Sequence, residues 1–165
     1  MSIFTALARP HKVTAVASAG ASGLITGAGN FDFKGEEGVY FLPDNTDETA
    51  LVPYMNTLGE FDVASHDLTD PTGDAYLRTN YFATRYGLDI EDRATYWNGK
   101  DRYTIWTDEN GIPLLENVFI GGRAHSHRPA ENRMIWDEWF TRFSRDPETG
   151  YVYYGDRLVE ASVIE

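Results

Sequence analysis

The sequence contains no cysteine and only four histidines in 165 residues. The absence of cysteine excludes a disulfide framework, a zinc site built on thiolates and a thiol nucleophile. No apolar run approaches the roughly 20 residues that a membrane-spanning helix needs. The amino terminus lacks the charged start and continuous apolar run of a signal peptide. We therefore expect a soluble chain without a membrane partner, in the cytoplasm, or in a virion if it comes from a phage.

Basic residues are also few. The chain has 14 Lys and Arg against 26 Asp and Glu, which gives a formal net charge of −12. Such a charge repels the phosphate backbone and anionic lipid at long range, so general nucleic-acid or membrane binding is disfavoured. We interpret the excess of acid as a solvated surface that keeps the protein in solution. The length suits one domain, with or without an extended arm.

The first thirty residues differ in composition from the rest. Residues 15–29 (AVASAGASGLITGAG) are almost all small and offer little apolar area to offset the entropy lost on ordering. Their glycines do not form G-x-G-x-x-G, and no Gly-Lys-Ser/Thr follows, so a phosphate-binding loop is not indicated. Ser22 lies in GASGL, which is not the G-x-S-x-G of a nucleophile elbow. We predict an arm over 1–30, flexible or ordered as a strand by a neighbour, and one β-rich domain over 31–165.

Short strand-like runs follow the arm. FDFKG and GVYFLP, within 31–43, favour strands because they are aromatic and are bounded by glycine and proline. The stretch 51–68 is ambiguous, and Pro53 argues against a central strand there. Thr, Tyr and Phe dominate 75–88, which favours a strand, although a helix remains possible.

Two hairpins are indicated more clearly. RYTIWT (102–107) and PLLENVFIGG (113–122) flank a turn that contains Asn110–Gly111, a strong signal for a tight turn between antiparallel strands. At the carboxyl end, YVYY and RLVEASVI flank Gly155–Asp156, which suits a two-residue turn with glycine first. We predict one hairpin at each place.

The most regular pattern is an amphipathic helix over about 129–144. Pro129 is well suited to the first helical position. Large apolar residues then recur on one side of the helix, and polar residues take the other side. The predicted apolar stripe consists of Ile135, Trp136, Trp139, Phe140 and Phe143. The fold class that we predict is mainly β, a β-sandwich or small β-barrel with this one packed helix and the extended amino-terminal arm.

One group of residues has the chemistry of a metal site. If the strand over 113–122 continues to His127, then His125 and His127 project on the same side as Arg123. With Glu131 they spell H-x-H-x-x-x-E, which resembles the first metal motif of the cupin family. The resemblance implies a small β-barrel in which the two histidines and the glutamate hold one divalent metal, iron, manganese or zinc.

The same residues also have a structural interpretation. Glu131 falls at the third helical position, where its carboxylate can reach back to the N–H of the cap residue. The two histidines would then lie on an exposed strand end near Arg123 and Arg128. Under this interpretation there is no metal, no cofactor and no catalytic residue.

Aromatic residues at Tyr96, Trp97, Tyr103 and Trp106 fit either a sugar-binding platform or, more simply, core positions on strands. Two classes of function follow. The first is a non-enzymatic structural or assembly protein, in particular a phage-type virion subunit of the tail or capsid, which self-associates through its β-rich domain and its arm. The alternative is a cupin-like metal-dependent enzyme or small-ligand barrel that uses His125, His127 and Glu131.

Overall fold

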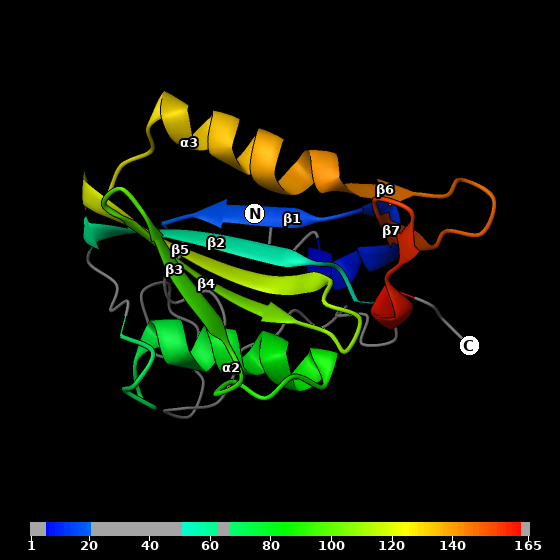
Figure 1. Ribbon diagram of the computed structural model, residues 1–165, viewed down its shortest axis with the longest axis horizontal. Helices are drawn as coiled ribbons and strands as arrows, with labels where there is room; N and C mark the ends of the chain where they lie inside the picture. Colours follow the sequence, from blue (N-terminus) through cyan, green and yellow to red (C-terminus); the bar gives the residue numbers. More distant parts are fainter. Residues whose placement is uncertain (1–5, 21–50, 63–66, 163–165) are drawn as a thin grey trace.

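The structure is a computed structural model that describes residues 6–20, 51–62 and 67–162. Its centre is a five-stranded sheet (Figure 1). In spatial order the strands are β1 (Val16–Ala19), β2 (Tyr54–Phe61), β5 (Pro113–Ala124), β4 (Asp101–Thr107) and β3 (Ala94–Asn98). Strands β1, β2 and β5 are parallel to one another, and β4 and β3 are added as antiparallel neighbours.

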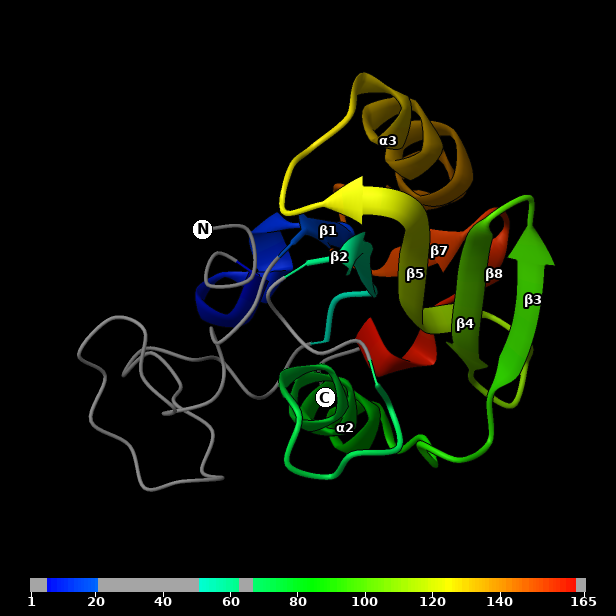
Figure 2. The same ribbon diagram turned by 90° about the vertical axis from the view of Figure 1, so that its left-hand side faces the viewer.

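Helices cover both faces of this sheet. Helix α2 (Asp74–Tyr86) lies on one face, and α3 (Pro129–Met134) lies on the other (Figure 2). A π-helical turn (Ile135–Trp139) and a 3-10 turn (Phe140–Arg142) continue α3. A three-stranded sheet follows, made of β6 (Phe143–Arg145), β7 (Val152–Tyr154) and β8 (Arg157–Leu158). Short 3-10 turns occur at Pro10–Lys12 and Glu160–Ser162.

The prediction of a mainly β domain with a packed helix near 129–144 is confirmed. The structure specifies the form of its β layer, which is an open mixed sheet with a second, smaller sheet beside it. Within the described residues, β1 and β3 are the edge strands of the larger sheet.

The helix that begins at Pro129 packs through every fourth residue. Ile135, Trp139 and Phe143 are buried, and the Trp139 indole N–H donates to the carbonyl of Val16 on β1 at 3.1 Å. The prediction that Trp136 belongs to the buried stripe is wrong, because its side chain is 62% exposed. The π-helical turn is wider than an α-helical turn, so residues four apart stay on the inner face and their neighbours turn toward solvent.

The region 75–88 is a helix, and the preference for a strand there is wrong. Five of its six buried positions recur at i, i+3, i+4, i+7 and i+8, the period of a helix. These positions are Ala75, Arg78, Thr79, Phe82 and Ala83. Hydrophobicity alone hides this period, because an arginine and a threonine occupy two of the inward positions. Gly87 ends the helix with a φ of 68°, and its N–H is directed to the carbonyls of Ala83 and Thr84.

Pro53 does not prevent the following residues from forming a central strand. Strand β2 begins one residue later and lies between β1 and β5. The missing N–H of Pro53 falls just outside the strand, while its carbonyl accepts a hydrogen bond from the Val16 N–H at 2.9 Å. The argument against a central strand is therefore wrong at this position.

Part of the predicted arm lies in the domain. Val16–Ala19 form β1, which orders against β2 of the same chain, with Val16 opposite Tyr54. Ala6 and Leu7 are buried in the hydrophobic core with Val16. Residues 21–30 of the arm, and the strands predicted within 31–43, lie outside the described residues.

The β4–β5 hairpin is confirmed, and so is the β7–β8 turn, although β8 extends only over Arg157–Leu158 and a 3-10 turn follows it. In the β4–β5 turn, Asp108 accepts hydrogen bonds from the N–H groups of Asn110 and Ile112, at 2.9 and 2.8 Å. Gly111 has a φ of 71°, a conformation that glycine adopts without strain. The second turn joins β7 to β8 and places Gly155 at a φ of 62°.

The two tryptophans of the α3 region provide a matched test of its packing. Trp139→Ala should lower the free energy of unfolding by about 3–5 kcal/mol, because it empties a fully buried site. Trp136→Ala should change it by less than about 0.5 kcal/mol, because this side chain is exposed. Urea denaturation of both variants measures the difference, and equal effects would contradict the packing described here.

Candidate functional site

The carboxyl ends of the three parallel strands meet at one end of the sheet. This end is on the left in Figure 1 and faces the viewer in Figure 2. Gly20 follows β1, Asp62 follows β2 and His125 follows β5. In open sheets built on parallel strands, ligands bind outside the carboxyl ends of the strands. The residues at these three strand ends are therefore the first place to look for chemistry.

His125 and Asp62 form a hydrogen-bonded pair at this end. The His125 Nδ1 lies 2.5 Å from Asp62 Oδ1. The Asp62 side chain is fully buried, whereas that of His125 is 56% exposed. An ionised carboxylate accepts and cannot donate, so Nδ1 is the donor in this contact. The other ring nitrogen, Nε2, has no hydrogen-bond partner within the described ranges.

The end of β1 lies against this pair. A Cβ atom at Gly20 would lie 3.5 Å from both Nδ1 and Cε1 of His125 and 3.4 Å from Asp62 Oδ2. Gly20 has a φ of 64°, so a side chain would also be strained there. All three parallel strands thus contribute to the surroundings of the imidazole.

Behind the pair lies a buried ion pair. Arg123 Nη1 contacts Glu131 Oε2 at 2.7 Å, and both side chains are almost completely buried. Thr57 on β2 contacts both partners: its hydroxyl donates to Glu131 Oε2 at 3.2 Å, and its carbonyl accepts from Arg123 Nη2 at 3.2 Å. Arg123 Nη2 also lies 3.5 Å from Asp62 Oδ2. One guanidinium therefore lies between two buried carboxylates.

Gly59 makes room for this arginine. A Cβ at Gly59 would lie 2.5 Å from the carbonyl oxygen of Arg123 and 2.9 Å from its Nε, distances that real Cβ atoms do not show. The register of β2 against β5 shifts between Gly59 and Phe61. The Gly59 N–H donates to Asp62 Oδ2 at 3.4 Å. This bulge-like irregularity directs the carboxylate back toward the strand ends.

His127 makes different contacts from His125 and does not contact Asp62 within the described residues. Its Nε2 lies 2.6 Å from Asn132 Oδ1, and its Nδ1 lies 3.7 Å from Glu131 Oε2. Strand β5 ends at Ala124 and therefore does not continue to His127, the condition under which the two histidines would project on one side. The chain turns instead, because the Ser126 N–H donates to the carbonyl of Ala124 at 2.7 Å.

The predicted capping contact of Glu131 is confirmed. Its Oε1 accepts a hydrogen bond from the N–H of Arg128, the residue before α3, at 3.1 Å. Its other oxygen faces Arg123. Glu131 therefore caps the first turn of the helix and joins that helix to the sheet.

The metal hypothesis places His125, His127 and Glu131 around one ion. The structure directs each of them elsewhere: His125 to Asp62, His127 to Asn132 and Glu131 to Arg123. In the part of the chain that the structure describes, no group of three or more His, Asp and Glu side chains is arranged to hold a metal. A guanidinium in contact with the carboxylate also opposes binding of a cation. A metal at these residues stays a prediction.

Asp62 is the partner of His125 that sequence reasoning misses. It lies 63 positions before His125, and motif searches relate residues that are close in sequence. The sequence nonetheless carries a signal for this pair. Asp62 directly follows the end of β2, and His125 directly follows the end of β5. Only the parallel pairing of β2 with β5 brings these two ends together.

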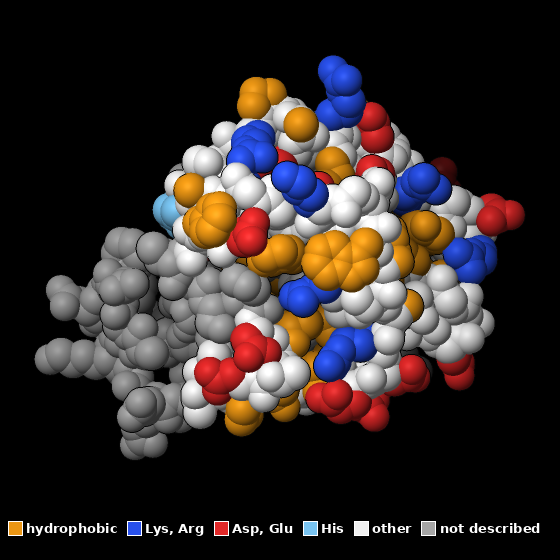
Figure 3. Space-filling model, turned by 60° about the vertical axis from the view of Figure 1, so that its left-hand side comes forward, with side chains coloured by type: hydrophobic (Ala, Val, Ile, Leu, Met, Phe, Trp, Pro, Cys, Tyr) orange, Lys and Arg blue, Asp and Glu red, His pale blue; other side chains and the backbone are white. Residues whose placement is uncertain are grey.

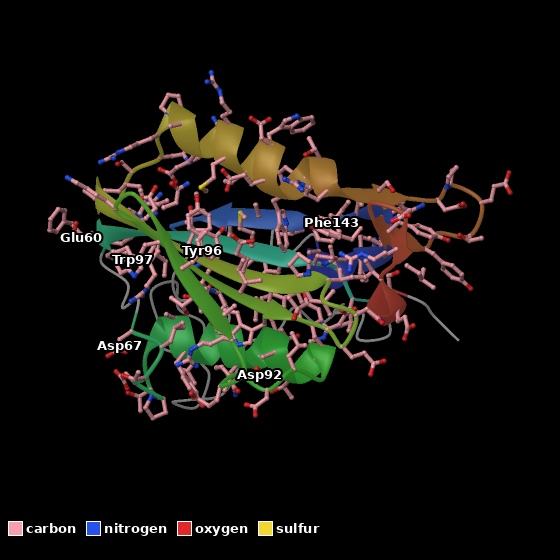
Figure 4. The ribbon with its side chains drawn as sticks, in the orientation of Figure 1. Glu60, Asp67, Asp92, Tyr96, Trp97 and Phe143 are labelled. Atoms are coloured by element: carbon pink, nitrogen blue, oxygen red, sulfur yellow. The ribbon has the colours of Figure 1, made fainter. Side chains whose placement is uncertain are left out.

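A third buried carboxyl group lies on the α3 face of the sheet. Glu116 on β5 is buried, and burial raises its pKa to about 8, with a further contribution from the negative charge of Glu138. Burial also raises the pKa of the neighbouring Tyr103 and Tyr96. Tyr96 and Tyr103 stack at 4.8 Å between ring centroids, and Figure 4 shows Tyr96 on the strand nearest the viewer.

No family model matches this chain, and no curated protein matches it. Across residues 6–20, 51–62 and 67–162, no helix has both the length and the apolar character to cross a membrane.

Glu116 makes stability depend on pH. Because its folded-state pKa is raised above the ordinary value of 4.5, the native state holds a proton that the unfolded state has released between about pH 4.5 and 8. Stability therefore falls as pH rises through this range. The wild type should therefore lose roughly 2–4 kcal/mol of unfolding free energy between pH 5 and pH 8. The Glu116→Gln variant cannot ionise at this position, so it should not show this loss. Urea unfolding at both pH values measures this loss.

The exposed Glu109 in the β4–β5 turn offers a control. Glu109→Gln should leave the pH dependence of unfolding as it is in the wild type. A Glu116→Gln protein with the wild-type pH dependence would contradict the raised pKa.

Proposed function

We propose that this chain carries the acid–base pair of a hydrolase that cleaves acyl bonds of the ester or amide type, with His125 as the general base and Asp62 as the residue that orients it. The observation that carries the proposal is the contact of 2.5 Å between the buried Asp62 carboxylate and the Nδ1 of a half-exposed histidine. A base held by a third group, with its second nitrogen directed outward, is the arrangement that activates a hydroxyl nucleophile.

The chemistry follows from the two ring nitrogens. In such a site Nε2 takes the proton of the attacking hydroxyl and later gives it to the leaving group. Asp62 holds the tautomer that leaves Nε2 unprotonated, and it stabilises the imidazolium that forms in between. The burial of Asp62 strengthens this interaction, because a carboxylate in a low-dielectric surrounding is less screened by water.

Chain order and position support the same class. The acid precedes the base, and each follows the carboxyl end of a parallel strand, β2 for Asp62 and β5 for His125. In α/β-hydrolases the catalytic groups follow one another in the order serine, acid, histidine. The matching order here favours a serine nucleophile that precedes Asp62.

Ser18 is the serine that precedes Asp62 within the described residues, and its hydroxyl is engaged elsewhere. It lies 2.6 Å from the Tyr54 hydroxyl and donates to Asn56 Oδ1 at 2.9 Å, in a buried position. Ser18 is therefore not assigned as the nucleophile, and the labelling experiment is designed to identify that residue.

Hydrolysis of a chromogenic short-chain ester, together with labelling by a fluorophosphonate, tests the proposal. His125→Ala should lower kcat/KM by about 10²–10⁴-fold, the contribution of a general base. Asp62→Asn should act in the same direction, because it no longer holds the reactive tautomer. Labelling should require His125, and mass spectrometry of the labelled peptide identifies the nucleophile.

His127→Ala is the matched control, because it removes a nearby imidazole that does not contact Asp62. It should leave hydrolysis and labelling close to those of the wild type. Hydrolysis that survives in His125→Ala, or that is lost equally in His127→Ala, would sink the assignment.

A second candidate function is the non-enzymatic assembly subunit, with a phage-type virion component as its specific form. One observation favours it: every residue of the edge strand β3 is exposed, including Trp97 at 60%. Figure 3 shows hydrophobic side chains gathered between charged ones on the molecular face turned forward there, and Figure 4 shows Trp97 near the end of the sheet. An exposed edge strand is a template for pairing with another chain.

The assembly proposal predicts an oligomer that depends on β3. Trp97→Arg should shift the mass measured by light scattering toward the monomer, because it places a charge in the proposed contact. Trp136→Arg changes an equally exposed tryptophan on the α3 side and should leave the mass unchanged. A wild-type protein that stays monomeric at every concentration would contradict the proposal.

A further inference from the structure

We infer that Arg123 is the positioning residue of the His125–Asp62 pair: its guanidinium, anchored by Glu131, holds the Asp62 carboxylate in the rotation that directs one oxygen to the imidazole. This inference rests on the proposed function for its catalytic meaning. Its geometric content stands on contacts that are present whether or not the protein is a hydrolase.

The two oxygens of Asp62 have different partners. Oδ1 faces His125 Nδ1 at 2.5 Å. Oδ2 faces Arg123 Nη2 at 3.5 Å and the Gly59 N–H at 3.4 Å. A rotation of the carboxylate would separate both oxygens from these partners at once. The contact with Arg123 is long for a hydrogen bond, but both side chains are almost completely buried, so water screens their attraction little.

Arg123 is itself held from several directions. Nη1 donates to Glu131 Oε2 at 2.7 Å and to the carbonyl of Ser126 at 2.9 Å, and Nη2 donates to the carbonyl of Thr57 at 3.2 Å. These partners belong to α3, to the turn that carries the histidines and to β2. The planar guanidinium therefore fixes the turn that follows β5 against both the helix and the neighbouring strand.

Charge balance gives the arginine a second role. Asp62 and Glu131 are both buried, and Arg123 is the cation in contact with each of them. Removing this cation takes a nearby positive charge away from two buried carboxylates, which is unfavourable. An Asp62 without Arg123 would gain from turning toward water or from binding a proton, and in either case it would hold the imidazole less well.

The test is NMR of protein labelled with ¹⁵N-histidine. The wild type should show a strongly deshielded Nδ1–H proton, assigned to His125 by its loss in His125→Gln. In Arg123→Met this resonance should disappear or move upfield, and kcat for the ester should fall by about 10²-fold with KM little changed. Arg128→Met, which removes an exposed arginine that donates to the Gly122 carbonyl instead, should retain both the resonance and kcat.

A second variant keeps the inference falsifiable if Arg123→Met does not fold. Arg123→Lys preserves the charge but lacks the fork that contacts both carboxylates, so the resonance should shift and kcat should fall by less than in Arg123→Met. A folded variant at 123 with the wild-type resonance and the wild-type kcat would overturn the inference.

The two proposals fail in different ways. If the resonance depends on Arg123 but the wild-type protein hydrolyses no ester and takes no label, then the positioning role stands and the proposed function is lost. If hydrolysis requires His125 but neither readout responds to Arg123, then the function stands and the positioning role is lost.

Discussion

The contact on which the rest of this site depends is the ion pair between Arg123 and Glu131, formed without access to water. It joins the end of β5 to the first turn of α3, two elements that the intervening turn would otherwise leave loosely related. Such a pair is costly to desolvate and adds little net stability, but removing one partner destabilises the fold strongly. Its value here lies in specificity, because it defines where the helix and the two strand ends meet, and the His125–Asp62 contact lies at that meeting point.

Much of the local structure could be predicted from the sequence, because the relevant signals are local. Asn110–Gly111 has turn chemistry that allows few alternatives, and Pro129 with the apolar residues that follow it defines the helix on that side of the sheet. The failures occur where tertiary contacts override local preference. Helix α2 buries Arg78 and Thr79, so its inward face does not read as apolar. Strand β2 begins just after Pro53, so the missing N–H of this proline removes no hydrogen bond from the sheet.

The candidate site shows the same division. The residue types near His125 and Glu131 indicate in the sequence that this region could carry chemistry, and they also predict the capping role of the glutamate. The partner of His125 is not, because Asp62 comes from a different strand and is brought close only by parallel pairing. The sequence pattern groups the two histidines with Glu131, an acidic residue close to them in the chain. In the fold, Glu131 pairs with Arg123 instead. The partner of the His125 imidazole is Asp62, which is more distant in the chain.

Gly59 shows how much can depend on one missing methyl group. A Cβ atom at this position would lie within 3 Å of the carbonyl oxygens of Arg123 and Ala124 and of the Arg123 Nε. The separation of β2 and β5, the position of the Arg123 guanidinium and the orientation of the Asp62 carboxylate therefore all depend on Gly59. A side chain at this position would push the ends of β2 and β5 apart, and it would alter the site without replacing either His125 or Asp62.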